Sequence, residues 1–344
     1  MGGRVACWMR WRPSAPGRRP EVGGFLDQMA LGSRERANAA MSTEPLEALR
    51  ARCADLPRPT ALARSGGFDL IAELKLRSPA LGDLGDARDD LDARVTTYAR
   101  AGAAAVSVLT EPSRFSGSLA QLEAAAAALA PLSVPAMRKD FLVDPYQLYE
   151  ARASGAGGAL LIVRMLSRGL LVEMLDCARE LGLFVLIETF DEADIDAAVE
   201  VLRQVGGGTP VTGQPEDDRG LPGERVSAFR ASGETPRVER AAQQSPSRHL
   251  AGRDVPVVDS VLLGVNSRDL QTLTVVPERL EQLAARLPRG YPRVAESGLT
   301  TPEDAARMAR AGYDMALVGG ALMAASDPGA LVAAMLAAGR SAGA

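Results

Sequence analysis

The sequence predicts an α/β fold in which eight parallel strands alternate with helices and close into a (β/α)8 barrel, and three observations support this. From Phe68 onward, short apolar runs alternate with segments of helical periodicity, as in parallel strands joined by crossover helices. The units follow one another at near-even spacing, and no GxGxxG turn follows the first strand. An open sheet of eight units is the alternative, but these features favour the closed TIM barrel.

Each expected strand is a short apolar run, and each expected helix has an apolar face. We expect strands at residues 70–75, 105–110, 136–141, 159–164, 184–188, 261–266, 293–297 and 315–318. The helices that follow them are expected at residues 91–101, 119–130, 145–154, 170–181, 191–202, 277–287, 302–311 and 328–338.

Two further helices are expected before the first strand. Phe25, Met29 and Ala30 lie at helical spacing within residues 25–41, and a second amphipathic stretch covers residues 44–54. Residues 1–23 carry five arginines but lack the apolar centre of a secretory signal. We therefore expect a disordered basic leader, followed by a single barrel domain over residues 24–344.

One segment interrupts the regular pattern. Residues 204–258 are rich in Gly, Pro, Ser, Arg and Glu and show no apolar periodicity, which predicts a disordered insertion before the sixth strand. Because the insertion follows a helix and precedes a strand, we expect it at the amino-terminal face of the barrel, opposite the active-site loops. It contains His249, the only histidine, so acid–base chemistry must use lysine and glutamate.

Composition limits the partners of the chain. A net charge of −4 gives no electrostatic attraction to nucleic acid or to an anionic membrane, and a small anionic ligand in one pocket remains possible. The three cysteines fit neither a disulfide framework nor a zinc site, and we expect no metal. No apolar run approaches the ~20 residues that span a bilayer. We expect a cytoplasmic protein that is a monomer or a weak homo-oligomer.

Charged and polar residues gather at the carboxyl ends of five expected strands, where barrel enzymes carry their catalytic groups. Any one of them alone is explained by a surface salt bridge, whereas their joint placement indicates an active site. These residues are Glu73, Lys75, Lys139, Glu188, Asn266, Arg268, Glu296 and Ser297.

A phosphate site is indicated after the last two strands. Gly298 ends the seventh strand, and Gly319 and Gly320 follow the eighth, which is the usual phosphate-binding address of this fold. Glycine lets backbone N–H groups approach phosphate oxygens closely. A tight turn that needs positive φ would explain the same glycines and is compatible with phosphate binding.

These segments closely resemble the indole-3-glycerol-phosphate synthase family, from about Phe25 to Ala338 apart from the insertion. The residues that carry the resemblance are IAELK at 71–75, RSP at 77–79, SVLTEP at 107–112, MRKDF at 137–141, DPYQ at 144–147, NSRDL at 266–270, AESG at 295–298 and VGGALM at 318–323.

The resemblance implies an enzyme of tryptophan biosynthesis that needs no metal or organic cofactor. Its substrate would be 1-(2-carboxyphenylamino)-1-deoxy-D-ribulose 5-phosphate, which loses CO2 and water as the indole ring closes. Lys139 would be the general acid that protonates the ketone oxygen. Lys75 would lie between carboxylate and phosphate, with Glu73 and Glu188 as acid/base partners whose division of roles stays open.

The resemblance also assigns the remaining site positions. They would be Asn266 against the anthranilate, Arg268 on the carboxylate or the glutamates, Glu296 and Ser297 completing the pocket, Phe115 in the apolar wall, and Ser78, Gly298, Gly319 and Gly320 at the phosphate. The expected helix at 25–41 matches the family's extra element over the active-site mouth, and a start at Met41 would remove it and weaken substrate binding.

The chain departs from the family pattern at Ala80-Leu81, where a second serine is usual. This departure and the insertion leave a catalytically silent barrel, kept as a binding or assembly subunit, as the alternative. The nearest enzyme alternative is phosphoribosylanthranilate isomerase, another phosphate-binding barrel of tryptophan biosynthesis, which uses a cysteine base near the first strand. Here that strand ends in Glu73 and Lys75, and Cys53 lies well before it, so the sequence disfavours this alternative.

Overall fold

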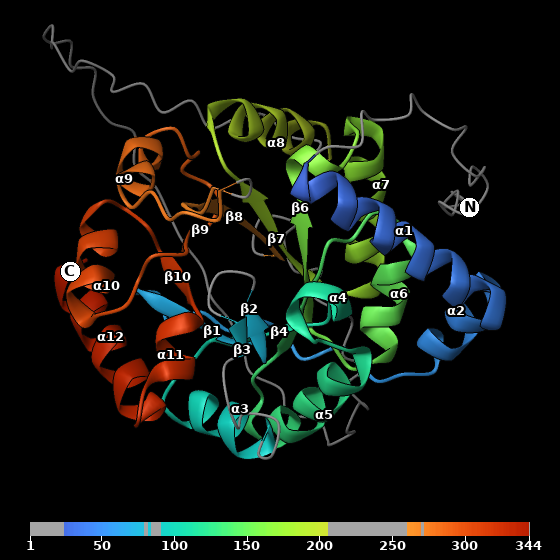
Figure 1. The fold of residues 1–344 in the computed structure, drawn as a ribbon, viewed down its shortest axis with the longest axis horizontal. Helices are drawn as coiled ribbons and strands as arrows, with labels where there is room; N and C mark the ends of the chain where they lie inside the picture. The colour runs from blue at the N-terminus through green and yellow to red at the C-terminus, as the bar shows by residue number, and fades with distance from the viewer. Residues whose placement is uncertain (1–23, 79–81, 84–90, 206–259, 270–271, 344) are drawn as a thin grey trace, which may run out of the picture. The chain divides into compact units, whose positions relative to one another are not determined.

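Eight parallel strands close into a barrel in the computed structural model, which describes residues 24–78, 82–83, 91–205, 260–269 and 272–343 (Figure 1). Around the barrel the strands follow chain order, and the last pairs with the first. They are β1 (Asp69–Leu74), β4 (Ala105–Leu109), β5 (Ala136–Lys139), β6 (Gly158–Ile162), β7 (Phe184–Thr189), β8 (Val261–Asn266), β9 (Arg293–Glu296) and β10 (Met315–Val318). The predicted closed barrel is confirmed.

Helices follow the strands and surround the barrel (Figure 1). They are α3 (Leu91–Arg100), α5 (Leu119–Leu129), α6 (Tyr146–Ala153), α7 (Arg168–Leu181), α8 (Glu192–Val205), α9 (Glu278–Ala284), α10 (Pro302–Arg310) and α12 (Pro328–Ala342). Several begin at side-chain caps, because Ser118, Ser167, Thr301 and Asp327 each accept a hydrogen bond from the backbone N–H three residues later.

Strand side chains alternate between two apolar cores. Ile71, Leu186 and Leu262 pack with one another inside the barrel. Leu70 and Leu263, one residue out of step with these, pack in the second cluster, which the surrounding helices share. This period of two is the reason that the strands read as almost continuous apolar runs.

Several observed boundaries differ from the expected ones by a few residues, and three of them bear on the site or the insertion. Strand β5 ends at Lys139 rather than at residue 141, because the N–H of Phe141 donates to the side chain of Asp140. Strand β6 ends at Ile162, and a 3₁₀ turn covers Val163–Met165. Helix α8 continues to Val205, two residues into the expected insertion. Residues 206–259 of that insertion, and the leader at 1–23, lie outside the described residues.

Short elements at the carboxyl ends of the strands were not expected. The antiparallel pair β2 (Arg77–Ser78) and β3 (Gly82–Asp83) follows β1, and α11 (Gly320–Ala324) follows β10. Helix α4 (Pro112–Phe115) follows β4 and begins with proline at its first position. Its capping residue Glu111 accepts hydrogen bonds from the N–H groups of Ser113 and Arg114.

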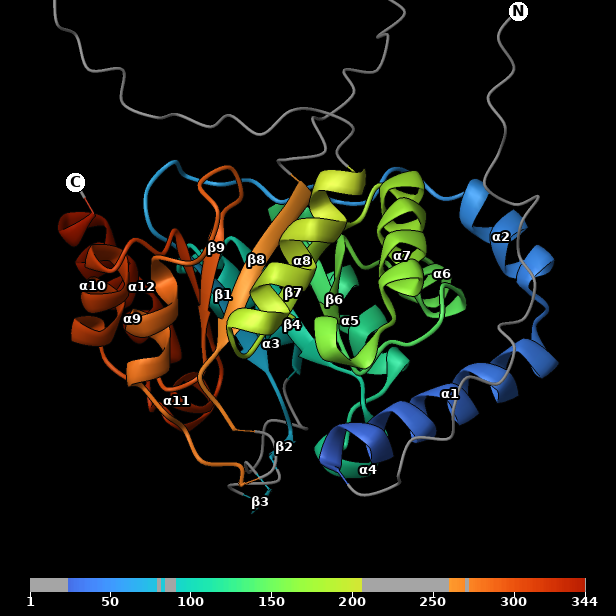
Figure 2. The ribbon, with the colours of Figure 1, turned by 90° about the horizontal axis from the view of Figure 1, so that it is seen from above.

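The expected amino-terminal helices are present as α1 (Phe25–Thr43) and α2 (Leu46–Ala54). Figure 2 shows α1 beside α4 at the end of the barrel that also carries β2 and β3. Met29 of α1 belongs to the core inside the barrel, so the helix covers part of the barrel mouth. Within the described residues, no helix combines the length and apolarity needed to cross a membrane.

Candidate active site

The strand alternation that builds the inner core also builds the polar site above it. On four strands a charged residue lies two positions after a residue of the inner core. The core residues are Ile71, Met137, Leu186 and Val294, and the charged residues that follow them are Glu73, Lys139, Glu188 and Glu296 respectively. Because side chains two apart face the same side of a strand, all four charged groups point into the barrel mouth at its carboxyl end. The predicted convergence of Glu73, Lys139, Glu188 and Glu296 is what the structure shows.

Lys139 lies at the centre of this group. Its Nζ is 3.2 Å from Glu188 Oε2, 3.6 Å from Glu296 Oε2 and 3.9 Å from Glu73 Oε2. Burial alone would lower the pKa of Lys139, but the negative charges of Glu188, Glu296 and Glu73 outweigh burial and raise the pKa above its ordinary value. Lys139 is therefore a protonated ammonium group, held in a mostly buried site.

A second cation, Lys75, completes the group at the end of β1. Its Nζ donates to Glu73 Oε1 at 2.7 Å. Burial opposes ionisation of Glu73, yet the charges of Lys75 and Lys139 prevail and lower the pKa of Glu73 below its ordinary value. The positive charge of Arg268 also lowers the pKa of Glu73. Glu73 is thus a carboxylate that stays ionised although almost wholly buried.

Glu296 has the opposite character. Burial, followed by the negative charge of Glu188, raises the pKa of Glu296 well above its ordinary value, against the opposing charge of Lys139. Among the described residues, no N–H or hydroxyl group donates a hydrogen bond to its carboxyl oxygens, and a hydrogen bond with the carboxyl group of Glu188 adds to the rise of the Glu296 pKa. The site therefore contains one carboxyl group that favours its protonated form beside one that favours its ionised form, the arrangement that separates acid from base in active sites.

Two glycines leave the space that these glutamates occupy. A Cβ built on Gly264 of β8 would lie 2.1 Å from Glu296 Oε1, and one built on Gly319 would lie 2.2 Å from Glu73 Oε1. No side chain larger than hydrogen fits at either position while the glutamates keep their places. Gly264 was not predicted as a site residue, although a glycine inside an apolar strand signals close approach of another group.

Three aromatic rings from three segments form an apolar wall beside the charges. Phe25 of α1 contacts Phe141 edge to face with ring centroids 5.8 Å apart, and Phe115 of α4 lies 6.1 Å from Phe141. The predicted Phe115 is in this wall. Phe25 and Phe141 were missed as site residues, because only the fold brings α1 and the β5 loop together.

The loop after β8 orients two predicted residues. Asn266 Oδ1 accepts a hydrogen bond from the backbone N–H of Arg268 at 2.9 Å, so the amide nitrogen of Asn266 is the atom that can donate to a ligand. Arg268 Nη1 donates to the carbonyl of Leu273 at 2.7 Å, which holds the guanidinium in a half-buried position. Burial lowers the pKa of Arg268, and the charge of Glu73 opposes this.

The phosphate end contains the predicted glycines. Ser297 and Gly298 have positive φ angles of 68° and 80°. A Cβ on Gly298 would lie 2.8 Å from Val275, so the turn requires glycine there. Because β10 lies between β9 and β1, the residues after these three strands are neighbours, and Gly298, Gly319 and Lys75 line the same cavity. The backbone of Ser78 pairs with Gly82 in the β2–β3 hairpin, while Ala80 and Leu81 lie outside the described residues.

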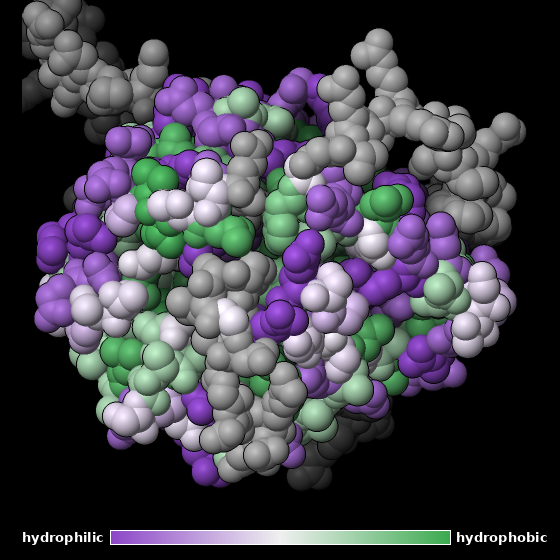
Figure 3. All heavy atoms as spheres, in the orientation of Figure 1, coloured by the Kyte–Doolittle hydropathy of each residue, from purple (hydrophilic) through white to green (hydrophobic). Residues whose placement is uncertain are grey.

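Twelve of the predicted site residues line one cavity of about 290 Å³. They are Glu73, Lys75, Phe115, Lys139, Glu188, Asn266, Arg268, Glu296, Ser297, Gly298, Gly319 and Gly320. The side chain of Ser78 lies outside the described part of the chain. In Figure 3 this end of the barrel faces the viewer, with hydrophobic and hydrophilic residues interspersed over it.

A larger groove of about 1060 Å³ lies elsewhere, between α9 and α10. Its walls include Arg64, Arg293 and Asp314, which stand at the amino ends of strands. Arg64 and Arg293 both pair with Asp314, and Arg307 pairs with Glu281. The smaller cavity is the candidate active site, because it holds the convergent titratable groups at the strand ends where barrel enzymes react.

A further signal in the sequence marks the two cations. Of 39 lysine and arginine residues in the chain, only Lys75 and Lys139 are lysines. Arginine can supply positive charge at the surface, but it does not give up a proton in proteins, whereas lysine can. The presence of both lysines in the cavity is therefore an indication of proton transfer that the sequence carries apart from its motifs.

The fold and the cavity define a barrel enzyme with a lysine–glutamate acid–base site, an apolar wall and a glycine-rich turn suited to phosphate. Comparison with known families agrees. Residues 27–207 and 253–335 match the model described as "Indole-3-glycerol phosphate synthase". The chain belongs to the indole-3-glycerol phosphate synthase family.

Several curated relatives of the same name cover nearly the whole chain. An indole-3-glycerol phosphate synthase of a Nocardioides species is 37% identical over 88% of this chain and 94% of its own length. One from a Parafrankia species is 36% identical over 91% and 96%, and one from Mycobacterium tuberculosis is 34% identical over 91% and 94%. Nothing in these matches supports the alternative of a catalytically silent barrel.

Proposed function

We propose that the cavity at the carboxyl end of the barrel carries out the family's reaction with the residues described above. The activity is that of an indole-3-glycerol phosphate synthase, a carboxy-lyase of tryptophan biosynthesis. It converts 1-(2-carboxyphenylamino)-1-deoxy-D-ribulose 5-phosphate to indole-3-glycerol phosphate, with loss of CO2 and water. The observation that carries the assignment of roles is Lys139 within 4 Å of three carboxyl groups.

The charges of the cavity suit a substrate with two anionic groups. Lys75, Lys139 and Arg268 supply three positive charges, and Glu296 favours its neutral form. These three cations outnumber the two carboxylates Glu73 and Glu188, and the remaining carboxylate of the lining, Asp140, is paired with Arg36 and Arg138. We assign the phosphate to the end formed by Gly298, Gly319 and Gly320 together with Ser78. Arg268 and Lys75 then face the substrate carboxylate, with Lys75 between the two anionic groups.

The first step needs an acid at the ketone and a fixed aromatic ring. Lys139, a protonated ammonium group, donates a proton to the ketone oxygen, and the carbonyl carbon becomes more electrophilic. The ring carbon that bears the carboxylate attacks it, forming the new C–C bond. Phe115, with Phe25 and Phe141, holds the ring from its apolar side, and Asn266 donates to the anthranilate.

Loss of CO2 and water completes the ring. The C–C bond to the carboxylate breaks, CO2 leaves and its electron pair restores the aromatic ring. The hydroxyl formed from the ketone then leaves as water, which requires a proton for the oxygen and removal of a proton from the neighbouring atom. Glu73, whose pKa is lowered, is suited to accept a proton, and Glu296 is suited to hold one. Lys75 and Glu188 are the other acid–base groups that we assign to this step, and Ser297 completes the pocket.

The decisive experiment compares Lys139→Met with Lys139→Arg, following the fluorescence of the indole product in purified protein. Arginine keeps the positive charge but does not release a proton, so both variants should lose about 10²- to 10⁴-fold in kcat. The arginine variant should still bind inorganic phosphate as wild type does. Arginine turnover near the wild-type rate would show that Lys139 acts through its charge alone and would refute the general-acid role.

We further propose that the enzyme works in the cytoplasm as a monomer or weak homo-oligomer. Among the described residues, the only large hydrophobic residue with more than about a third of its surface exposed is Leu31, at 53%. An obligate dimer interface requires a larger apolar patch than a single leucine offers. Sedimentation analysis of the purified protein at micromolar concentration tests the oligomeric state, and a stable dimer would refute this part of the proposal.

A further inference from the structure

The three rings of the apolar wall come from separate segments, so their relative positions depend on contacts between those segments. Phe25 lies in α1, Phe115 ends α4, and Phe141 lies in the loop after β5. Phe25 and Phe115 are half-buried, and their only ring contacts in the described structure are with Phe141. Contact between rings permits sliding, so exact placement needs directional polar contacts as well.

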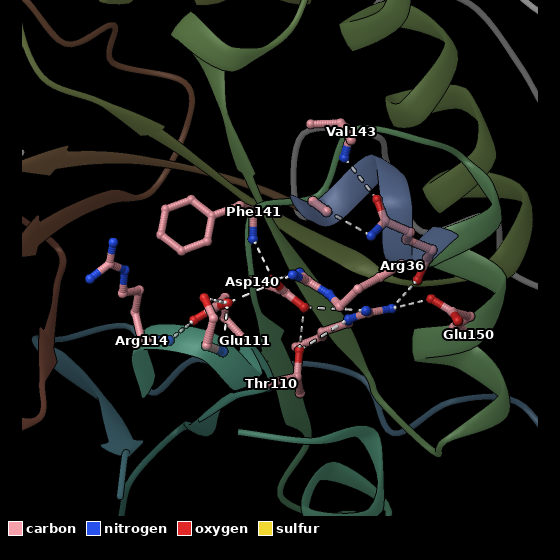
Figure 4. Close-up of polar contacts among 12 residues, drawn as sticks. Arg36, Thr110, Glu111, Arg114, Asp140, Phe141, Val143 and Glu150 are labelled. Carbon is pink, nitrogen blue, oxygen red and sulfur yellow. Dashed lines mark hydrogen bonds and ion pairs between the residues drawn. The ribbon is translucent and has the colours of Figure 1, made fainter. Parts of the chain in front are cut away.

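One such contact ties α1 to the loop that carries Phe141. Arg36 Nη2 of α1 donates to Asp140 Oδ1 at 2.7 Å, and the same oxygen accepts the backbone N–H of Phe141 at 2.8 Å (Figure 4). The side chain of Asp140 is only 1% exposed. A single buried carboxylate oxygen therefore joins α1 directly to the residue whose ring packs against Phe25.

A second contact ties α1 to α4. Arg36 Nη1 lies 3.7 Å from Glu111 Oε1. Glu111 caps α4, since its carboxylate accepts the N–H groups of Ser113 at 2.9 Å and Arg114 at 2.7 Å, and four residues later α4 presents Phe115. Figure 4 shows Arg36 reaching toward Asp140, with Glu111 nearby at the start of α4.

We infer that Arg36 is a positioning residue that fixes the three phenylalanine rings as the subsite for the aromatic ring of the substrate. Its own helix carries Phe25, its contact with Asp140 leads to Phe141, and its contact with Glu111 leads to Phe115. The planar guanidinium group can serve two carboxylates at once, which an ammonium group cannot do with fixed geometry. The inference rests on the proposed function, because it assumes that an aromatic substrate occupies this wall.

Removal of the guanidinium should leave the fold intact. Asp140 keeps hydrogen bonds from Thr110 Oγ1 at 2.8 Å, Arg138 Nη2 at 3.3 Å and its own loop, so it is not left as an unpaired buried charge. Helix α1 also stays attached through Ser33, whose hydroxyl accepts from Gln147 Nε2 at 2.9 Å. Arg36 itself is 30% exposed, and methionine can replace its aliphatic stem.

The test is the kinetics of Arg36→Met and Arg36→Lys, with ribulose 5-phosphate as a competitive inhibitor that lacks the aromatic ring. We expect KM for the full substrate to rise about two- to tenfold in the methionine variant, the value of an aromatic contact, with kcat nearly unchanged. The inhibition constant of ribulose 5-phosphate should stay at its wild-type value. Lysine should restore part of the effect, because it keeps the contact with Asp140.

A matched control is Arg52→Met, which removes the paired hydrogen bonds between Arg52 and Glu44 at the junction of α1 and α2, away from the wall. It should leave KM unchanged. The effects of Arg36→Met and Phe115→Ala should combine to less than their product, because both act on one wall. An unchanged KM, an equal weakening of ribulose 5-phosphate, or fully multiplicative effects would each overturn the inference. Absence of turnover in the wild type would instead refute the proposed function.

Discussion

Gly264→Ala is expected to disable the site by displacing one catalytic carboxyl group. A Cβ at this position would lie 2.1 Å from Glu296 Oε1 and 3.0 Å from Leu186 Cδ1. Glu296 must therefore withdraw by at least about 0.9 Å to reach the shortest contact that real Cβ atoms make. It is fully buried beside Lys139 and Glu188, so a shift of that size changes its distances to both groups.

The magnitude follows from the size of this displacement. Misplacement of a catalytic group by about 1 Å costs on the order of 10²-fold in rate. We therefore expect kcat of Gly264→Ala to fall about 100-fold, and not below that of Glu296→Gln, which removes the carboxyl group altogether. Overpacking of a buried site should also lower the free energy of unfolding by about 1–3 kcal/mol.

The assay is product fluorescence under saturating substrate, together with urea unfolding of the same preparations. Gly290→Ala is the matched control, because its Cβ would meet no atom within 4 Å, and it should keep wild-type turnover. A kcat for Gly264→Ala within twofold of wild type would refute the reasoning. It would mean that Glu296 can move without consequence or does not take part in the reaction.

Two further predictions concern the stability of the site and the insertion. Burial and Glu188 raise the pKa of Glu296, so the stability it contributes is present below the ordinary carboxyl pKa and is lost as pH rises toward the folded-state value. Glu296→Gln should therefore be more resistant to urea than wild type at pH 8, by about 1 kcal/mol, with a smaller difference at pH 4; a larger difference at pH 4 would contradict this. If residues 204–258 are a tolerated insertion, limited proteolysis within them should leave turnover intact, and loss of turnover on cleavage would assign them a role in the active enzyme.

The barrel could be predicted from the sequence because its signal is local and repeated. Each strand is a short apolar run, and each helix has an apolar face, so eight similar units indicate the topology before any contact is known. The boundaries could not be predicted in the same way where tertiary contacts decide them. Strand β5 stops at Lys139 because Asp140 turns its carboxylate to the N–H of Phe141, an interaction that no propensity encodes.

The charged half of the site could be predicted for a similar reason. Once the strands were placed, their ends located Glu73, Lys139, Glu188 and Glu296 at one mouth. The aromatic half could not be assembled in this way, since Phe25 and Phe141 are 116 residues apart and meet only when α1 folds over the mouth. Arg36 was missed for the same reason, because its partners Asp140 and Glu111 lie on two other segments.

The residues that make room for charge are as informative as the charges themselves. A barrel mouth narrow enough to bring three glutamates around one lysine has no space for ordinary side chains on the neighbouring strands. Glycine therefore stands where Glu296 and Glu73 approach the backbone, at Gly264 and Gly319. A strand-end glutamate opposite a glycine is thus a stronger indication of a catalytic carboxyl group than either residue alone. Combined with lysine in a chain that otherwise uses arginine, the pattern points to proton transfer rather than to a structural ion pair.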